Sequence, residues 1–371
     1  MNILYTNFHV SPNIGGHTAY ISRLVCGLKA KHKVFLAVPG SSALFRTFQN
    51  SSDVQVFDQS FPNKLAQMPA ALKMLKRVIS EQNFDIIHVN GSADHRLVML
   101  ALLGQKKRPS IVFTKHNDHP VHSFGSKLRA KFGTDHTIAV CDFVGTILAQ
   151  SPYADVGVTT IFNGIDTNYF SSVVGNNIES IREKLFGPEN SKKIILGSNA
   201  GTASYKGWID LVHALTHLDP SQADCFHIAI AGATPSKILV DKVHELGMDK
   251  HFTYVGSLVD VRPFLNAIDI GFVLSHRVET ISFACREMMA MRKPVIVTNH
   301  AGLPENIDHG VDGWVVERQN PEKIAKLLKA ILDGRFDLSC MSKAARIKSE
   351  NSFGDEKFIS MTEDVYRNLL K

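Results

Sequence analysis

Short hydrophobic runs rich in β-branched residues alternate with amphipathic stretches along the first half of the chain. The runs have the length and composition of buried strands, whereas the stretches carry hydrophobic residues at helical spacing. The predicted strands are residues 3–7, 33–38, 54–57, 86–89, 110–114, 136–140 and 159–162. The predicted helices are residues 18–31, 70–81, 96–104 and 143–151. Strands that alternate with helices predict a parallel sheet with helices on both faces.

The same alternation begins again after residue 171. The predicted strands are residues 193–197, 226–231, 252–255, 270–274, 295–298 and 313–316, and the predicted helices are 208–218, 237–246, 261–267, 283–291 and 321–333. A polar, glycine-containing segment, residues 163–177, joins the halves. We therefore expect an α/β protein with two doubly wound domains, residues 1–170 and 171–352. Such sheets bind ligands at the carboxyl ends of their strands, so two facing domains would form a cleft.

Length and composition agree with this organisation. A chain of 371 residues accommodates two domains, and 44% hydrophobic with 20% charged residues is ordinary for a soluble protein. The first residues lack the basic start and long apolar core of a signal peptide. The longest clean apolar run, residues 97–103, is shorter than the roughly 20 residues that span a bilayer. We expect a cytoplasmic protein, soluble or peripheral on the inner membrane.

Cysteine and histidine usage argues against disulfides and metal sites. The five cysteines are scattered and show no close pairing, which fits a reducing compartment. The 17 histidines include no His-x-x-x-His pattern with a supporting acid on a predicted helix. We expect no metal and no cofactor.

Positive charge is concentrated in the first half. Residues 1–170 contain 17 Lys and Arg against 10 Asp and Glu, and the remainder contains 24 against 25. This asymmetry is typical of a surface that meets an anion, such as nucleic acid, an anionic membrane or a phosphorylated glycolipid, although a merely basic surface would look the same. The basic and aromatic segment 123–132 could face a membrane or form an ordinary amphipathic helix.

Three short motifs follow predicted strands. Gly15 and Gly16 lie between the first strand and a helix, where glycine lets the backbone approach a phosphate, although an ordinary turn would use the same residues. His116 lies at the end of strand 110–114 and would project into the cleft, although a core or surface histidine is the commoner outcome for any one position. Lys206 follows the first strand of the second half and could reach a diphosphate or could simply be solvated.

Two carboxylates eight positions apart are the most informative feature of the second half. Glu279 lies in the loop before the predicted helix 283–291, and Glu287 would lie two turns inside that helix. The free N–H groups at the start of a helix favour an anion. One carboxylate could bind ribose hydroxyls while the backbone binds phosphate, although two solvated glutamates would give the same pattern.

Together these motifs resemble glycosyltransferase family 4, the retaining nucleotide-sugar transferases of the GT-B fold. The resemblance covers nearly the whole chain and is strongest over residues 163–316. Its most specific element is a Glu-x7-Glu segment followed by Pro-Val and Gly-x-Pro-Glu. Here these residues are Glu279, Glu287, Pro294, Val295, Gly302, Leu303, Pro304 and Glu305. The opening residues 4–9 resemble bacterial transferases that build the lipopolysaccharide core.

The resemblance implies two Rossmann-like domains facing across a cleft. Residues 1–170 would bind the acceptor, residues 171–352 the nucleotide sugar, and helix 353–371 would return to the first domain. Glu287 would bind the ribose, Lys206 would neutralise the diphosphate, and Glu279 would lie at the donor sugar. The amides of Thr280, Ile281 and Ser282 would approach the sugar or diphosphate. Gly15 and Gly16 would approach the phosphates from the first domain, and His116 would line the sugar and acceptor side.

The implied activity is transfer of a sugar, with retention of configuration, from a nucleotide-diphosphate sugar to a glycan or lipid-linked acceptor in lipopolysaccharide core or other cell-surface polysaccharide synthesis. Two departures from the family pattern bear on the donor. No arginine stands near Ser198 and Asn199, where the family usually has one for the diphosphate. Thr280 and Ser282 replace the glycines of the family's Glu-Gly-Phe-Gly. The alternatives are a non-enzymatic nucleotide or nucleic-acid binder, or an epimerase or phosphorylase of the same fold; we expect no nucleic-acid partner.

Overall fold

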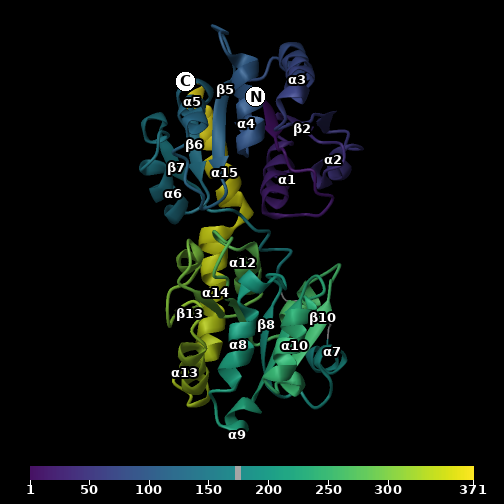
Figure 1. The fold of residues 1–371 in the computed structure, drawn as a ribbon, viewed down its shortest axis with the longest axis vertical. Helices are drawn as coiled ribbons and strands as arrows, with labels where there is room; N and C mark the ends of the chain where they lie inside the picture. The colour runs from purple at the N-terminus through teal and green to yellow at the C-terminus, as the bar shows by residue number, and fades with distance from the viewer. Residues whose placement is uncertain (172–176) are drawn as a thin grey trace. The chain divides into compact units, whose positions relative to one another are not determined.

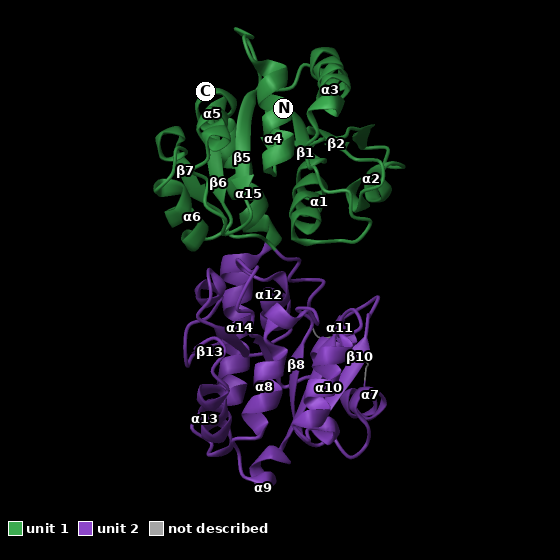
Figure 2. Cartoon of the chain, in the orientation of Figure 1, with its two compact units in different colours: residues 1–164, 355–371 green, residues 165–354 purple. Residues whose placement is uncertain are grey.

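A parallel sheet forms the centre of each of two units in the computed structural model, which describes residues 1–171 and 177–371. Unit 1 comprises Met1–Gly164 and Asp355–Lys371, and unit 2 comprises Ile165–Gly354 (Figure 2). The chain thus enters unit 2 at Ile165, whereas the sequence suggested a boundary after residue 170. Part of the predicted join, residues 172–176, lies outside the described residues.

The sheet of unit 1 has the strand order β3-β2-β1-β4-β5-β6-β7, and every pair is parallel (Figure 1). Its strands are β1 (Asn2–Thr6), β2 (Lys33–Val38), β3 (Val54–Asp58), β4 (Ile86–Val89), β5 (Ser110–Lys115), β6 (His136–Ala139) and β7 (Val158–Thr160). Its helices are α1 (Gly16–Leu28), α2 (Ala43–Phe48), α3 (Met68–Gln82), α4 (Ser92–Leu102), α5 (Phe124–Gly133), α6 (Asp142–Ala149) and α15 (Asp355–Leu369), with short 3-10 turns η1 (Leu65–Gln67) and η2 (Ala154–Val156). The strand order reverses between β1 and β4, the position at which such sheets bind ligands.

The sheet of unit 2 has the order β10-β9-β8-β11-β12-β13 and is also parallel. Its strands are β8 (Ile194–Ser198), β9 (Phe226–Ala231), β10 (Phe252–Gly256), β11 (Ile270–Val273), β12 (Val295–Thr298) and β13 (Gly313–Val316). Its helices are α7 (Ile178–Phe186), α8 (Trp208–Leu215), α9 (Pro220–Ala223), α10 (Lys237–Glu245), α11 (Arg262–Ala267), α12 (Phe283–Ala290), α13 (Pro321–Leu332) and α14 (Leu338–Phe353), with 3-10 turns η3 (Ser204–Lys206), η4 (Asp249–His251) and η5 (Leu303–Asn306). The strand order of unit 2 reverses between β8 and β11.

Continuous hydrophobic runs explain why these strands lie at the centre of each unit. Every residue of β4, β9, β11 and β12 is buried, as expected for parallel strands covered on both faces. In unit 2 the hydrophobic core includes Trp208 from α8 and Trp314 from β13, which are 1% and 0% exposed. The buried sheets hold the strand ends, and therefore the loops that follow them, in fixed positions.

The last helix, α15, packs against unit 1 beside α1. The hydroxyl of Tyr366 lies 2.9 Å from that of Tyr5 on β1, and it also hydrogen-bonds Nδ1 of His88 on β4. On the helix surface, Asp355 forms an ion pair of 2.8 Å with Arg23 of α1. Unit 1 is therefore built from two segments of the chain that are separated by the whole of unit 2.

Candidate functional site

The loops after β8 and β11 bring Lys206 and Glu279 together in unit 2. Lys206 is the last residue of η3, and its Nζ lies 2.7 Å from Oε2 of Glu279. Both side chains are largely buried, at 17% and 12% exposed, so solvent screens this ion pair only partly. The hydroxyl of Ser275 donates a 3.3 Å hydrogen bond to the same carboxylate oxygen. A cation and a carboxylate that lie 73 residues apart in the sequence thus form one polar cluster, at the position where the strand order of this sheet reverses.

Residues 279–282 form a tight loop that leads into α12. Val278 and Ser282 have left-handed backbone angles, with φ of 51° and 54°. Such angles favour glycine, so a side chain at Ser282 costs about 1–2 kcal/mol there. The hydroxyl of Ser282 accepts a 3.4 Å hydrogen bond from the amide of Cys285 and caps the helix. The backbone therefore keeps a conformation suited to glycine although the residue is serine.

A buried asparagine fixes the position of this loop from behind. Nδ2 of Asn306, in η5, donates hydrogen bonds of 2.7 Å to the carbonyl of Ile281 and 3.0 Å to that of Leu303. Its Oδ1 accepts a 2.8 Å hydrogen bond from Nε of the fully buried Arg286. The Arg286 guanidinium also stacks 4.0 Å from the centre of the Phe353 ring. Ile281 and Ser282 are themselves buried, and Thr280 is half-buried.

Glu287 contacts Asn199, a residue that was not among the predicted site residues and was noted only because an arginine is missing near it. Glu287 is the fifth residue of α12, so it lies about one turn inside the helix rather than two as predicted. Its Oε2 accepts a 2.7 Å hydrogen bond from Nδ2 of Asn199, which follows β8. Among the described residues, the buried Oδ1 of Asn199 has no hydrogen-bond partner. An acceptor and a carboxylate thus lie side by side at the carboxyl end of β8, a suitable pair for sugar hydroxyls.

His116 lies directly after β5 in unit 1 and is 9% exposed. Its Nε2 is 2.9 Å from Oδ1 of Asn90, which follows β4, and its ring stacks 4.1 Å from the ring of His17. Burial, reinforced by His17, His88, His9 and Lys115, holds the pKa of His116 well below its usual value. The imidazole is therefore neutral at physiological pH, and Nε2 carries the proton that Asn90 accepts.

A cavity of about 420 Å³ opens beside His116 in unit 1. It lies at the carboxyl ends of β1, β4 and β5, where His9, Asn90 and Lys115 follow or end those strands. Among the lining residues only His116 was predicted as a site residue, while Arg129 belongs to the basic segment 123–132. Asn90 carries the same signal as His116, a polar residue directly after a buried strand, but the order of the strands had to be known before the two could be grouped.

Gly15 and Gly16 lie at the start of α1. Both are exposed, and Gly15 has an extended backbone with φ of −115°. A Cβ at Gly15 would meet no atom of the described residues within 4 Å, apart from its chain neighbours, so packing inside unit 1 does not require glycine at this position. The open space before α1 leaves room for a ligand to approach the backbone.

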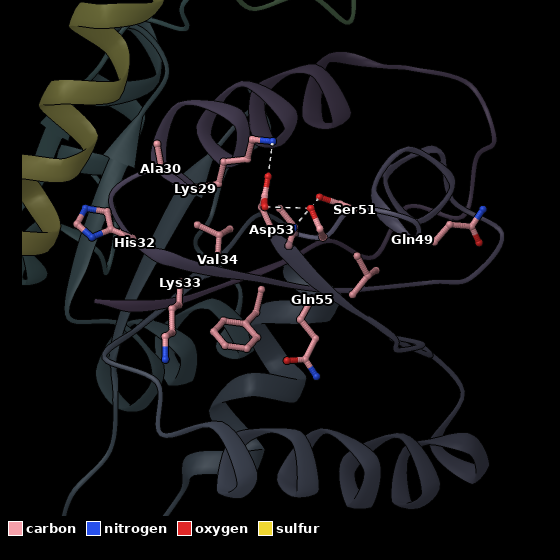
Figure 3. Close-up of a pocket in the computed structure, with 13 residues that line it drawn as sticks. Lys29, Ala30, His32, Lys33, Val34, Gln49, Ser51, Asp53 and Gln55 are labelled. Atoms are coloured by element: carbon pink, nitrogen blue, oxygen red, sulfur yellow. Dashed lines mark hydrogen bonds and ion pairs between the residues drawn. The ribbon is translucent and has the colours of Figure 1, made fainter.

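A second hollow in unit 1, of about 880 Å³, lies at the opposite ends of the strands (Figure 3). It is lined by the first residues of β2 and β3 and by the loops before them, where Lys29 and Asp53 form a 3.4 Å ion pair. Because parallel sheets bind ligands at their carboxyl ends, we assign it no part in the chemistry.

The described residues contain no group of three or more His, Cys, Asp or Glu side chains placed to hold a metal ion. Over the same residues, no helix combines the length and the hydropathy that crossing a bilayer requires.

Comparison with known proteins assigns both halves of the chain. Residues 14–169 match the family described as Glycosyltransferase Family 4, and residues 177–349 match Glycosyl transferases group 1. Spore coat protein SA of Bacillus subtilis is 24% identical over 305 residues, covering 78% of this chain and 79% of that protein. N-acetyl-alpha-D-glucosaminyl L-malate synthase of Bacillus anthracis is 23% identical over 311 residues, covering 81% and 79%.

The solved structures agree on the fold. The crystal structure of HepE from Anabaena in complex with UDP superposes with a TM-score of 0.85 at 18% identity, covering 99% of this chain and all of that one. Two α/β units, each built on a parallel sheet, are the architecture of GT-B enzymes. The chain therefore belongs to the group 1 glycosyltransferases of the GT-B fold.

Proposed function

We propose that this glycosyltransferase transfers a sugar from a nucleotide-diphosphate sugar to a glycan or lipid-linked acceptor, with retention of configuration and without a metal ion. The observation that carries the proposal is the polar cluster of unit 2, in which Lys206 contacts Glu279 and Asn199 contacts Glu287 at the carboxyl ends of β8 and β11. The solved HepE complex contains UDP, which supports a nucleotide donor.

Each side chain has a role that follows from its chemistry. The Glu287 carboxylate and Oδ1 of Asn199 would accept hydrogen bonds from ribose hydroxyls. Lys206 and the start of α12 would stabilise the negative charge that grows on the leaving diphosphate. Because Lys206 already pairs with Glu279, its ammonium would contact both the Glu279 carboxylate and the diphosphate once the donor is bound. That lysine is our candidate to compensate for the arginine missing near Ser198.

The reaction we propose needs no covalent intermediate with the protein. The acceptor hydroxyl oxygen would form its bond to the anomeric carbon on the face from which the diphosphate departs. The bond from that carbon to the diphosphate oxygen would break, and the diphosphate would take the acceptor's proton. Neutral His116 would line the sugar and acceptor side as a hydrogen-bonding group, since its low pKa leaves the ring without the second proton of an imidazolium, the one that could be released as an acid.

We also propose a place for the reaction. The acceptors we favour are lipid-linked intermediates of lipopolysaccharide core or other cell-surface polysaccharides, reached at the cytoplasmic face of the inner membrane. Helix α5 supports this proposal because it carries Lys127 and Lys131 together with two exposed aromatic side chains, Phe124 and Phe132, which are 75% and 45% exposed. Basic and aromatic side chains on one short helix suit an anionic lipid surface.

Calorimetry with UDP-, GDP- and ADP-sugars tests the donor site. We expect at least one donor to bind, and Glu287→Ala to weaken that donor about 100-fold or more because ribose loses a charged acceptor. Glu245→Ala is the matched control, since that glutamate lies on α10 with a 65% exposed side chain. Binding of no donor would count against the proposed function, and full affinity in Glu287→Ala would remove Glu287 from the ribose contact.

Product analysis tests the finer claims. NMR of the product should show the donor's anomeric configuration, and transfer should continue at an unchanged rate in excess EDTA. An inverted product, or a rate abolished by EDTA and restored by a divalent cation, would contradict retention or metal independence respectively.

A further inference from the structure

The cavity at the carboxyl ends of β1, β4 and β5 has an unusual distribution of charge. Three of its lining residues, Arg96, Lys115 and Arg129, are cationic. None of the described residues that line it is Asp or Glu. The remaining lining includes the neutral polar side chain of Asn90 and the apolar ring of Phe113. The cavity is therefore positive on several sides.

Among the described residues, these three cations lack the carboxylate partners that several arginines elsewhere in the chain have. Within the described residues, no carboxylate oxygen lies within 4.0 Å of a charged nitrogen of Arg96, Lys115 or Arg129. By contrast, Arg108 and Arg182 each form a 2.5 Å ion pair with an aspartate. Buried and half-buried cations without a carboxylate partner are costly, so a group of them around one cavity favours binding of an anion.

Arg96 shows this most clearly. One terminal nitrogen, Nη2, donates to the carbonyl of Pro62 at 2.9 Å and to Oδ1 of Asn63 at 3.1 Å, so the guanidinium is held in place by neutral groups. Its buried Nε has no hydrogen-bond partner among the described residues. Arg129 is held similarly, with Nη2 donating to the hydroxyl of Ser126 at 3.1 Å. Both side chains are oriented without being neutralised.

Lys115 supplies a buried charge at the end of β5. It is 4% exposed, and its ammonium hydrogen-bonds Oδ1 of Asn117. Burial lowers the pKa of Lys115 to about 8, and Asp118 opposes the shift. The lysine is still mainly protonated at pH 7, and an anion in the cavity would favour that state further.

The start of α4 also faces the cavity, because Gly91 and Ser92 line it. A Cβ at Gly91 would lie 2.2 Å from the Phe8 ring, so this close approach requires glycine. The nearby Asp94 carboxylate is hydrogen-bonded to the hydroxyl of Thr6 and the amide of Asn90, each at 2.8 Å, and does not line the cavity. Asp94 already places a carboxyl at the start of this helix, so the preference for an anion rests on the three cations.

From this arrangement we propose that the cavity binds an oxyanionic group of the acceptor, a phosphate or a carboxylate carried on a sugar, through Arg96, Lys115 and Arg129. Its volume of about 420 Å³ suits a ligand of monosaccharide size. The inference rests on the proposed glycosyl transfer and specifies its substrate class: the acceptor is an acidic sugar rather than a neutral one.

Matched sugars test the charge preference. Glucose 6-phosphate, glucuronate and glucose are titrated into the full-length protein by calorimetry, each in the presence of saturating UDP, GDP and ADP in turn. We expect glucose 6-phosphate or glucuronate to bind at least tenfold more tightly than glucose, and the stronger of the two distinguishes phosphate from carboxylate. Equal affinity for glucose, or displacement of the acidic sugar by a nucleotide, would overturn the proposal, because the latter would assign the cavity to the donor.

Variants locate the binding. Arg96→Gln and Lys115→Met should each weaken the acidic sugar about tenfold or more, the loss expected for one charge-assisted hydrogen bond. Lys73→Gln on the exposed side of α3 is the matched control and should bind normally. Far-ultraviolet circular dichroism and nucleotide binding establish that each variant is folded. Wild-type affinity in both folded cavity variants would refute the assignment.

The two proposals fail separately. Binding of a nucleotide sugar with transfer only to neutral acceptors would leave the glycosyltransferase function intact and refute the acidic acceptor. Binding of acidic sugars with no nucleotide sugar bound would support the anion site and refute the donor site of unit 2.

Discussion

Gly207 links the candidate donor site to the core of unit 2, and Gly207→Ala should disturb both. The residue lies between Lys206 and Trp208, where η3 ends and α8 begins, and its φ is +68°. A Cβ there would lie 2.0 Å from the carbonyl oxygen of Leu274, the residue that follows β11. The backbone must therefore move to make room for the added methyl group. Leu274 precedes Ser275, whose hydroxyl hydrogen-bonds Glu279, so this movement would also disturb the candidate donor site.

Comparison with a second glycine separates the causes of the loss in unfolding free energy. Gly247 has nearly the same angle, φ +66°, but a Cβ there would meet nothing within 4 Å. Gly247→Ala should therefore cost only the left-handed strain of about 1–2 kcal/mol, reduced by about 0.4–1 kcal/mol through a stiffer unfolded chain. Gly207→Ala carries the same two contributions and in addition about 1–3 kcal/mol for forced displacement of packed atoms.

Urea unfolding followed by tryptophan fluorescence measures the difference directly. The chain has two tryptophans, Trp208 and Trp314, and both are buried in unit 2, so the signal reports the unit that contains both glycines. Gly207→Ala should lose about 1–3 kcal/mol more unfolding free energy than Gly247→Ala, and it alone should weaken the nucleotide sugar. Equal losses in the two variants would show that the close approach to Leu274 has no energetic consequence.

Two further predictions concern unit 1. Burial lowers the pKa values of His88 and His95 to about 3, so the stability that these neutral side chains contribute above pH 6.5 is lost as the pH falls toward 3, by about 2 kcal/mol each at pH 5. Asp94 acts oppositely, because burial raises its pKa to about 7 and its contribution grows as the pH falls from 7 toward 4. Acidification to pH 5 should therefore lower the free energy of unfolding of unit 1, measured by hydrogen exchange, by about 2 kcal/mol less in His95→Gln than in the wild type. The exposed His119→Gln should behave like the wild type. Sedimentation with anionic liposomes should recover the protein, and Phe124→Ser should reduce that recovery; equal recovery with neutral liposomes would refute the electrostatic part of the membrane proposal.

Much of the sheet architecture could be predicted because buried parallel strands are continuous hydrophobic runs. The predicted strand 226–231 coincides with β9 for this reason. Helix α2, Ala43–Phe48, was missed because six residues are too few to show a period. Helix α14, Leu338–Phe353, was missed because most of its residues are polar and few are buried. Local pattern therefore finds the centre of each unit more readily than its surface.

Some residues of the candidate site could also be predicted from the sequence, whereas others could be found only in the fold. Glu279 and Glu287 could be selected because their spacing belongs to a known motif. Asn199 and Asn90 could not, since each acquires its significance from a partner 88 or 26 residues away along the chain. The cationic cavity likewise depends on Arg96 and Arg129, which lie on different helices. The two arginines line the same cavity only because α4 and α5 pack together.

The discontinuous construction of unit 1 has a consequence for biosynthesis. The ribosome delivers α15 only after all of unit 2 has been made, so β1 and β4 must wait for the Tyr366 hydroxyl that hydrogen-bonds Tyr5 and His88. Unit 2 is contiguous and has every strand and helix it needs before translation ends. The donor-side half can thus mature on the nascent chain, while the half with the cationic cavity is completed last.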